Sequence, residues 1–326
     1  MKKLLSIAIA AAVAAPMAVS AETTLYGRVD TAVINTDNDL ANGDTWDVST
    51  NSSRIGLKGD EDLGNGLKAI FQYEFGANTS EGGAYGDAIN NRLGYVGLTG
   101  GFGTVAIGRQ WTPYYGSVDK TDIMNLNPSA GALDGDSVDA NANGHYLGLT
   151  RTGGALAYVT PDFNGFSGKL ALVMNDDRIG GGTSDGVDAY NVSLDYNNGP
   201  LSVGFSYLDF DNAIAAGDRW GLAGKYNFGN FALIAQYEDM DDAPGMPNTG
   251  GDSFGIAAQA FFGNNTLYAV YGEKDLDNMT TDLASMGIGV QHSFSKATRV
   301  YVDYQEQEKS ATVDTSTFGI GLRHDF

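Results

Sequence analysis

Segments of about 8–12 residues in which apolar and polar side chains alternate recur along most of the chain. In residues 67–75 the odd positions are all apolar or aromatic, whereas Lys68, Gln72 and Glu74 stand between them. A period of two places the two sets on opposite faces of a β-strand. The pattern predicts sixteen strands, at residues 23–35, 53–61, 67–76, 90–99, 103–111, 154–160, 167–175, 187–197, 200–211, 217–228, 230–240, 251–262, 266–275, 282–294, 298–308 and 314–326.

The connections between these strands alternate between short and long. Short turns carry Gly or Asn, which tolerate positive φ, and include residues 64–66, 100–101, 197–199, 229–230 and 263–265. Longer polar loops are predicted at 36–52, 77–89, 176–186 and 240–250. Short turns on one rim and long loops on the other are typical of bacterial outer-membrane barrels, and a soluble β-sandwich gives no reason for them. The apolar faces are therefore expected to meet lipid and the polar faces a water-filled lumen.

The two ends of the chain fit the same interpretation. The last strand alternates from Phe318 to Phe326, as suits a sheet that must close on itself. At the start, Lys2 and Lys3 precede an apolar stretch and a Val19-Ser20-Ala21 cleavage site, which predicts a secretory signal peptide at residues 1–21. Removing it from the 326 residues leaves one domain of 305, residues 22–326, and takes the formal charge from −21 to −23.

Composition narrows the classes of partner. The chain has no cysteine, so hydrogen bonds and packing rather than disulfides must hold it together. Its pI of about 4.2 argues against nucleic acid, whose phosphates need a basic face. The negative charge favours accumulation of cations at the mouths of a pore, so the sequence favours a preference for cations.

One connection has neither strand pattern nor short length. Residues 112–144 contain several carboxylates, among them Asp119 and Asp122. Loops this long inside a compact domain are usually functional or disordered. Inside a wide barrel such a loop can fold inward and narrow the lumen.

The order of short motifs along the chain resembles that of the general diffusion porins, the trimeric sixteen-stranded class of Gram-negative bacteria. The resemblance covers essentially the whole mature chain. It rests on Leu25-Tyr26-Gly27-Arg28, Ser53-Arg54-Ile55-Gly56-Leu57-Lys58-Gly59, Asn91-Arg92-Leu93-Gly94-Tyr95-Val96-Gly97-Leu98, Thr121-Asp122-Ile123-Met124, residues 158–166 and the final Phe326.

This resemblance implies a pore constriction in which a basic wall faces acids on the in-folded third loop. The basic row maps onto Arg28, Arg54, Arg92 and Arg151, and strand alternation independently turns Arg28 and Arg54 toward the lumen. The loop acid maps onto Asp122. The second loop acid of the family falls near Leu126-Asn127, where this chain departs from the pattern and Asp119 is the candidate substitute. Phe326 corresponds to the C-terminal assembly signal.

Other possible sites are weaker. Residues 139–144 match the opening of a calcium loop, but Thr150 stands where the essential Glu should be. We therefore expect no cofactor, with weak binding of divalent cations at acidic loops as an alternative. His145, His292 and His324 show no metal-ligand spacing. Ser293 beside His292 lacks any signature of a nucleophile with an oriented base, so an enzyme is not expected.

The sequence therefore predicts an all-β, sixteen-stranded antiparallel transmembrane barrel of the outer membrane, with short periplasmic turns, long extracellular loops and an in-folded third loop. We expect passive diffusion of small hydrophilic solutes and ions. The resemblance implies a homotrimer, in which the loop at 77–89 contacts the neighbouring subunit. Lipopolysaccharide, outer-membrane lipid and the barrel-assembly machinery are the other expected partners. A solute-specific channel and a plugged structural or adhesive barrel remain alternatives.

Overall fold

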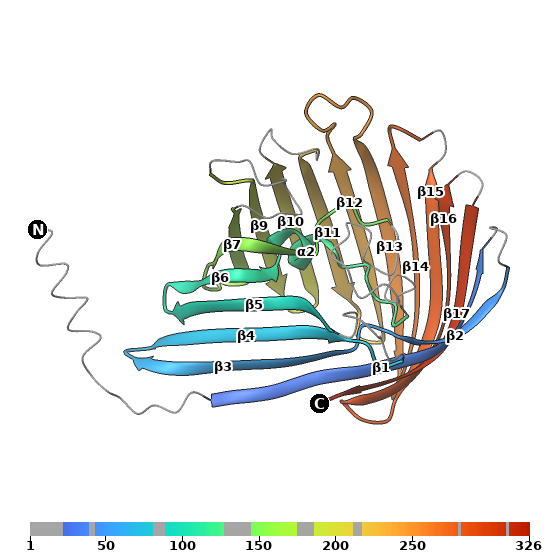
Figure 1. Ribbon diagram of the computed structural model, residues 1–326, viewed down its shortest axis with the longest axis horizontal. Helices are drawn as coiled ribbons and strands as arrows, with labels where there is room; N and C mark the ends of the chain where they lie inside the picture. The colour runs from blue at the N-terminus through green and yellow to red at the C-terminus, as the bar shows by residue number, and fades with distance from the viewer. Residues whose placement is uncertain are drawn as a thin grey trace, which may run out of the picture.

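The computed structural model describes residues 22–38, 43–80, 89–126, 145–174, 186–210, 217–279, 282–310 and 313–326. Strands make up nearly all of this part, and they follow one another around a wide barrel (Figure 1). In chain order they are β1 (Glu22–Asn38), β2 (Thr45–Thr50), β3 (Arg54–Gly64), β4 (Leu67–Ala77), β5 (Ile89–Gly100), β6 (Gly103–Trp111), β7 (Arg151–Val159), β8 (Phe166–Val173), β9 (Ala189–Asn198), β10 (Leu201–Phe210), β11 (Arg219–Asn227), β12 (Phe231–Met240), β13 (Gly251–Phe262), β14 (Asn265–Leu276), β15 (Leu283–Ser293), β16 (Thr298–Ser310) and β17 (Val313–Asp325).

The barrel is closed by its first and last strands. From β3 onward each strand pairs antiparallel with the next, and β17 pairs with β1 from Arg28↔Asp325 to Asn38↔Thr315. The first half of β1 pairs with β3 and its second half with β2. Because β2 and β3 are two parts of one interrupted strand, the seventeen segments of the described chain form the predicted sixteen-stranded barrel.

The predicted long loop at 36–52 was wrong at residues 36–38 and 45–50, which belong to strands. Strand β1 continues to Asn38, and β2 occupies Thr45–Thr50. The mixed sequence Thr-Trp-Asp-Val-Ser-Thr carries too short an alternation to predict a strand by itself. Pairing with β1, from Thr31↔Thr50 to Thr36↔Thr45, stabilises the extended conformation.

The distribution of burial is the reverse of that in a water-soluble sheet protein. Apolar side chains on the outer face are about half exposed, as at Leu194 (53%), Leu233 (50%) and Ile256 (52%). Polar side chains on the inner face are buried, as at Gln236 (4%) and Asp303 (1%). This arrangement suits a barrel with lipid outside and polar contacts inside. Within the described residues, no helix has the length and apolar character needed to cross a membrane.

Candidate functional site

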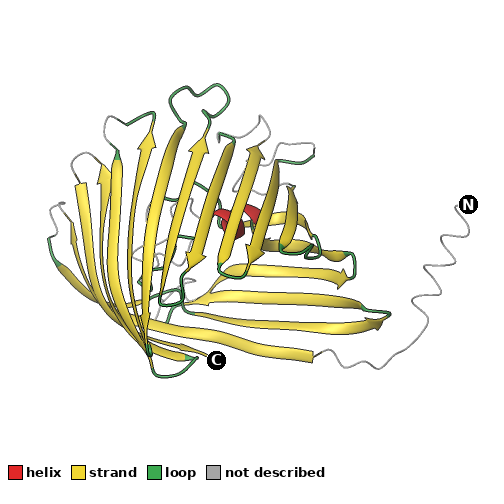
Figure 2. Cartoon of the chain, turned by 180° about the vertical axis from the view of Figure 1, so that it is seen from behind, coloured by secondary structure: helices red, strands yellow, loops and turns green. Residues whose placement is uncertain are grey.

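The connection between β6 and β7 runs from residue 112 to residue 150, and its described parts, which we call the inner loop, lie inside the barrel. These parts are residues 112–126 and 145–150. The loop was predicted to end at residue 144 and the next strand to start at residue 154. Strand β7 in fact starts at Arg151, so the loop extends to residue 150. The short helix α2 (Pro113–Val118) opens the loop and lies within the barrel in both views (Figures 1 and 2).

Helix α2 forms because its start is well capped and the face that it turns to the barrel wall is apolar. The Thr112 hydroxyl accepts a hydrogen bond from the backbone N–H of Tyr115 (3.0 Å), and Pro113 occupies the first turn. Tyr114 and Val118 are fully buried against the inner wall of β8–β10. The wall is shaped for this contact, since a Cβ on Gly204 or Gly221 would collide with the helix. The inner loop is therefore packed onto the wall.

Polar side chains of the wall fix the inner loop at several points of its two described parts. Most of them accept hydrogen bonds from its backbone or hydroxyl groups, which satisfies donors that would otherwise be buried without a partner. The donors and acceptors are Tyr114 N to Asn191 Oδ1 (2.8 Å), Ser117 Oγ to Asp195 Oδ2 (2.9 Å), Thr121 Oγ1 to Gln236 Oε1 (2.7 Å), Asn125 N and Leu126 N to Asp303 Oδ2 (2.9 and 2.8 Å), and Leu147 N to Glu238 Oε2 (3.2 Å).

The second described part of the inner loop starts at His145, whose side chain is fully buried. Its Nε2 lies 2.9 Å from the Thr121 hydroxyl, and its Nδ1 lies 3.3 Å from that of Ser285. The ring occupies space that Gly255 and Gly272 leave open, because a Cβ on either glycine would collide with it. The loop is thus attached to β13 and β14 by shape and to Ser285 on β15 by a hydrogen bond.

Two of the predicted basic residues share one acid on the opposite side of the barrel. Glu74 on β4 lies 2.7 Å from Arg92 Nε and 3.9 Å from Arg54 Nε. It also accepts a hydrogen bond from the hydroxyl of Tyr26 (3.0 Å). The Arg92 and Glu74 side chains are only 3% and 6% exposed. Arg92 would point outward under strict alternation with Val96 and Leu98, but it is an extra residue at a β-bulge and turns inward.

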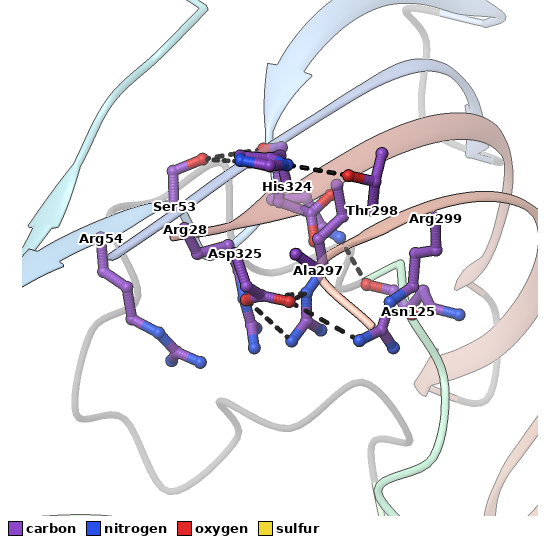
Figure 3. A network of polar contacts seen from close by, with 12 residues as sticks. Arg28, Ser53, Arg54, Asn125, Ala297, Thr298, Arg299, His324 and Asp325 are labelled. Carbon is purple, nitrogen blue, oxygen red and sulfur yellow. Dashed lines mark hydrogen bonds and ion pairs between the residues drawn. The ribbon is translucent and has the colours of Figure 1, made fainter. Parts of the chain in front are cut away.

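Arg28 belongs to a second cluster, centred on Asp325 near the end of the chain. Asp325 lies 2.8 Å from Arg28, 2.9 Å from Arg323 and 3.6 Å from Arg299. Figure 3 shows Asp325 between Arg28 and Arg299, and the side chain of Arg54 points in the same direction as that of Arg28. The sequence prediction missed Arg299 and Arg323. Strand alternation could have found both, since Val300 and Leu322 next to them belong to the apolar face.

Arg151 meets the start of the inner loop through an aromatic stack. The guanidinium groups of Arg151 and Arg92 lie 4.7 and 5.8 Å from the centre of the Trp111 ring. Trp111 stacks on Tyr115 at 4.8 Å. Burial raises the pKa of Tyr115, as do Asp122 and Asp119, whereas Arg151 and Arg92 oppose the rise. Tyr115 is therefore within electrostatic reach of both the basic and the acidic candidates.

The two loop acids differ in exposure. Asp122 is exposed, whereas Asp119 at the end of α2 is half-buried. Both lie within electrostatic reach of Tyr115, as do Arg92 and Arg151. Their role in a constriction stays a prediction.

Phe326 closes the ring of strands. Its backbone N–H donates to Gly27 O (3.0 Å), and its carbonyl accepts from Gly27 N (2.9 Å). Its ring covers Gly27 on the outer face, where a Cβ would meet the ring at 2.5 Å. The predicted assembly role of Phe326 stays a prediction.

Several other predictions concern positions away from this site. The signal peptide at 1–21 and the calcium-like stretch at 139–144 lie outside the described residues, as does most of the predicted subunit-contact loop at 77–89. Among described residues no group of three His, Asp or Glu could hold a metal ion. His292, considered beside Ser293, lies 2.8 Å from the amide oxygen of Asn265.

The sequence profile of the Gram-negative porin family matches residues 8–312. This chain belongs to the Gram-negative porins. Outer membrane porin protein 32 of Delftia acidovorans is 33% identical over 242 residues, which cover 70% of this chain and 66% of that protein. An outer membrane porin protein of Bordetella pertussis is 31% identical over 278 residues, covering 74% and 70%. The matched region thus spans about two thirds of these curated relatives. The family places the barrel in the outer membrane.

Solved structures agree with the fold of this porin. The anion-selective porin from Comamonas acidovorans is 25% identical, with a TM-score of 0.77 over 94% of this chain and 100% of that one. Salmonella typhi OmpF in complex with daunomycin is 18% identical, with a TM-score of 0.74 over 94% and 98%, and supports the fold alone. The predicted sixteen-stranded antiparallel barrel is confirmed.

Proposed function

We propose that this porin forms a water-filled channel through which small hydrophilic solutes and ions diffuse passively. The observation that carries the proposal is the inner loop, whose described parts pack onto the inner wall of the barrel from β8 to β16, while the arginines of the two clusters line β1, β3, β5, β16 and β17. A wall of charged side chains in contact with water sets ion preference in a pore. The field between the arginines and the loop acids Asp119 and Asp122 would orient solutes as they pass.

We further propose that the constriction prefers anions. In the two wall clusters five arginines share the two carboxylates Glu74 and Asp325. Arg151 adds charge nearby, so the local balance is positive even with Asp119 and Asp122 opposite. The total charge of the chain favours cations instead, but charge beyond about 10 Å is largely screened at 0.1 M salt. The porin from Comamonas acidovorans is described as anion-selective, which agrees with this proposal.

Reversing the charge of Arg54 should move ion preference toward cations. Arg54→Glu removes a positive charge from the proposed constriction and adds a negative one beside Glu74. In a planar bilayer under a salt gradient, we expect the reversal potential to shift toward the cation value. Lys68→Glu makes the same change of charge at the short-turn rim, where Lys68 is half exposed, and should shift it little.

The outcomes separate the candidate functions. Folded wild-type protein without conductance would exclude the pore and favour a structural or adhesive barrel. Conductance that saturates with one solute would favour a specific channel. An unchanged reversal potential in Arg54→Glu would keep the pore and remove Arg54 from the constriction.

We also propose that the porin is a homotrimer that folds through the barrel-assembly machinery into a membrane containing lipopolysaccharide. A related fold, OmpT of Vibrio cholerae, has been solved in a trimer form. Light scattering of the detergent-extracted protein, corrected for bound detergent, should give three times the mass of one chain, and conductance should rise in groups of three equal steps. A mass of one chain with single steps would contradict the trimer and leave the pore intact.

A further inference from the structure

One tryptophan stands where the arginines of the wall meet the inner loop. Trp111 is the last residue of β6, and Arg151 is the first residue of β7. The two residues are directly opposite each other in the pairing of these strands, so strand pairing itself brings their side chains together. Strand β6 leads straight into α2 inside the barrel (Figure 1). Trp111 therefore lies at the base of the inner loop.

The ring of Trp111 contacts two positive charges. Its centre lies 4.7 Å from the guanidinium carbon of Arg151 and 5.8 Å from that of Arg92. Both distances are within the roughly 6 Å over which the face of an aromatic ring attracts a cation, and Trp is the strongest of the aromatic residues in this contact. Arg92 comes from β5 and Arg151 from β7. One uncharged side chain thus contacts guanidinium groups from two strands.

The inner loop holds the tryptophan ring in turn. Trp111 stacks on Tyr115 of α2, with ring centres 4.8 Å apart and ring planes inclined by 14°. Tyr115 meets the edge of the Tyr146 ring at 6.1 Å, and Tyr146 is 1% exposed in the second described part of the loop. Offset stacks and edge-to-face contacts are the arrangements that aromatic pairs prefer. The stack therefore fixes the position of the ring that the two arginines contact.

Burial makes this contact important for the two charges. The Arg92 side chain is 3% exposed and Arg151 is 4% exposed, so water in the lumen can solvate them only slightly. Buried charges need compensation from their surroundings. Glu74, 2.7 Å from Arg92 Nε, supplies part of it and cancels one positive charge. An aromatic ring attracts a guanidinium group without neutralising it, so the positive charge still acts on the lumen.

We propose that Trp111 is a positioning residue for ion preference, which holds the guanidinium groups of Arg92 and Arg151 in the wall without cancelling their charge. It would act on permeating anions through these arginines rather than by touching the anions. Because the side chain is uncharged, counting the charges around the lumen would not find it. This inference rests on the proposed pore function.

The test measures the permeability ratio of chloride to potassium, obtained from reversal potentials of the full-length protein in planar bilayers under a potassium chloride gradient. Trp111→Leu keeps an apolar side chain and the same net charge but removes the aromatic face. We expect the ratio to fall about twofold to fivefold, because the two guanidinium groups lose a partner that fixes their position. Trp111→Phe restores an aromatic face and should recover most of the wild-type ratio.

A double-mutant cycle shows whether Trp111 acts through the arginines. Arg151→Gln removes one of the two guanidinium groups that the ring contacts. In that background Trp111→Leu should lower the ratio by a clearly smaller factor than in the wild type, because residues that act together give non-additive effects. Equal factors in the two backgrounds would mean that Trp111 affects permeation independently of Arg151, and the inference would be wrong.

Two further variants separate positioning from loss of packing. Trp220→Leu makes the same substitution on the outer face of β11, between Phe205 and Tyr237, and should leave the ratio unchanged. Tyr115→Leu breaks the loop side of the stack and leaves Trp111 beside the arginines. It should make the open current noisier and change the ratio less than Trp111→Leu does. Equal changes of the ratio would assign the effect to a loosened inner loop and overturn the inference.

The remaining outcomes each decide a point. An unchanged ratio in Trp111→Leu would overturn the inference while the pore stands. A wild-type ratio below one would contradict the proposed anion preference, but a fall of the ratio in Trp111→Leu would still support the positioning role. Absence of current from folded wild-type protein would instead show that the pore proposal itself has failed. Unchanged β-sheet circular dichroism and heat-modifiable migration would show that the variants fold.

Discussion

The Asp303→Ala variant is expected to detach the middle of the inner loop and to open the channel irregularly. Asp303 Oδ2 accepts the backbone N–H groups of Asn125 and Leu126, while Oδ1 accepts the hydroxyl of Tyr268. Each buried donor left without an acceptor costs about 1–3 kcal/mol. Loss of two backbone contacts therefore costs about 2–6 kcal/mol, which raises the detached population roughly 30-fold to 25,000-fold. Single-channel recordings should show larger and noisier open currents.

Two further variants make the Asp303→Ala result specific. Asp303→Asn keeps one acceptor oxygen of the same shape, so its current should lie between those of the wild type and Asp303→Ala. Asp60→Ala removes a carboxylate that is 42% exposed at the short-turn rim and touches no part of the inner loop, so its current should match the wild type. If Asp303→Ala gave wild-type currents without added noise, the carboxylate would not be what holds the loop.

The Glu74→Gln variant is expected to lose stability and gain anion preference at once. The carboxylate compensates Arg92, which is 3% exposed, and lies near Arg54. Removing one partner of a buried ion pair typically costs about 3–5 kcal/mol, because the other charge stays buried without compensation. Differential scanning calorimetry in detergent should show a lower unfolding temperature. The reversal potential should shift toward the anion value, since the wall gains one net positive charge.

Asp325→Asn offers a matched comparison because it removes the same charge from the other cluster. Asp325 is 32% exposed and its three arginine partners are 16–24% exposed. Water can therefore solvate their guanidinium groups once the carboxylate is removed. We expect a similar shift in reversal potential with a much smaller loss of stability. Equal losses of stability in the two variants would mean that burial does not control the cost of removing the acid.

The barrel could be predicted from the sequence because its two signals are local. The alternation from Leu67 to Phe75 assigns a face to each residue, and turn residues such as Asn65 mark where strands reverse. Strand β2 was missed because its extended form depends on pairing with β1. Such pairing joins residues that no short window contains.

The candidate site was less predictable for a similar reason. Alternation turns Arg28 and Arg54 inward, and it could also have found Arg299 and Arg323. It fails at Arg92, where a β-bulge changes the face of the side chain. The sequence also could not show which arginines each acid neutralises, because Glu74 and Asp325 meet their arginines only once the strands are in register.

The fit of His145 against Gly255 and Gly272 has a consequence for how this sequence can diverge. The ring fills space that side chains of β13 and β14 would otherwise occupy, although position 145 and these strands are more than a hundred residues apart. A larger residue at either glycine position therefore requires a smaller one at position 145, and neither change is tolerated well alone. Loop and wall must covary at these three positions, so a loop exchanged between related porins would need its matching pair of wall residues.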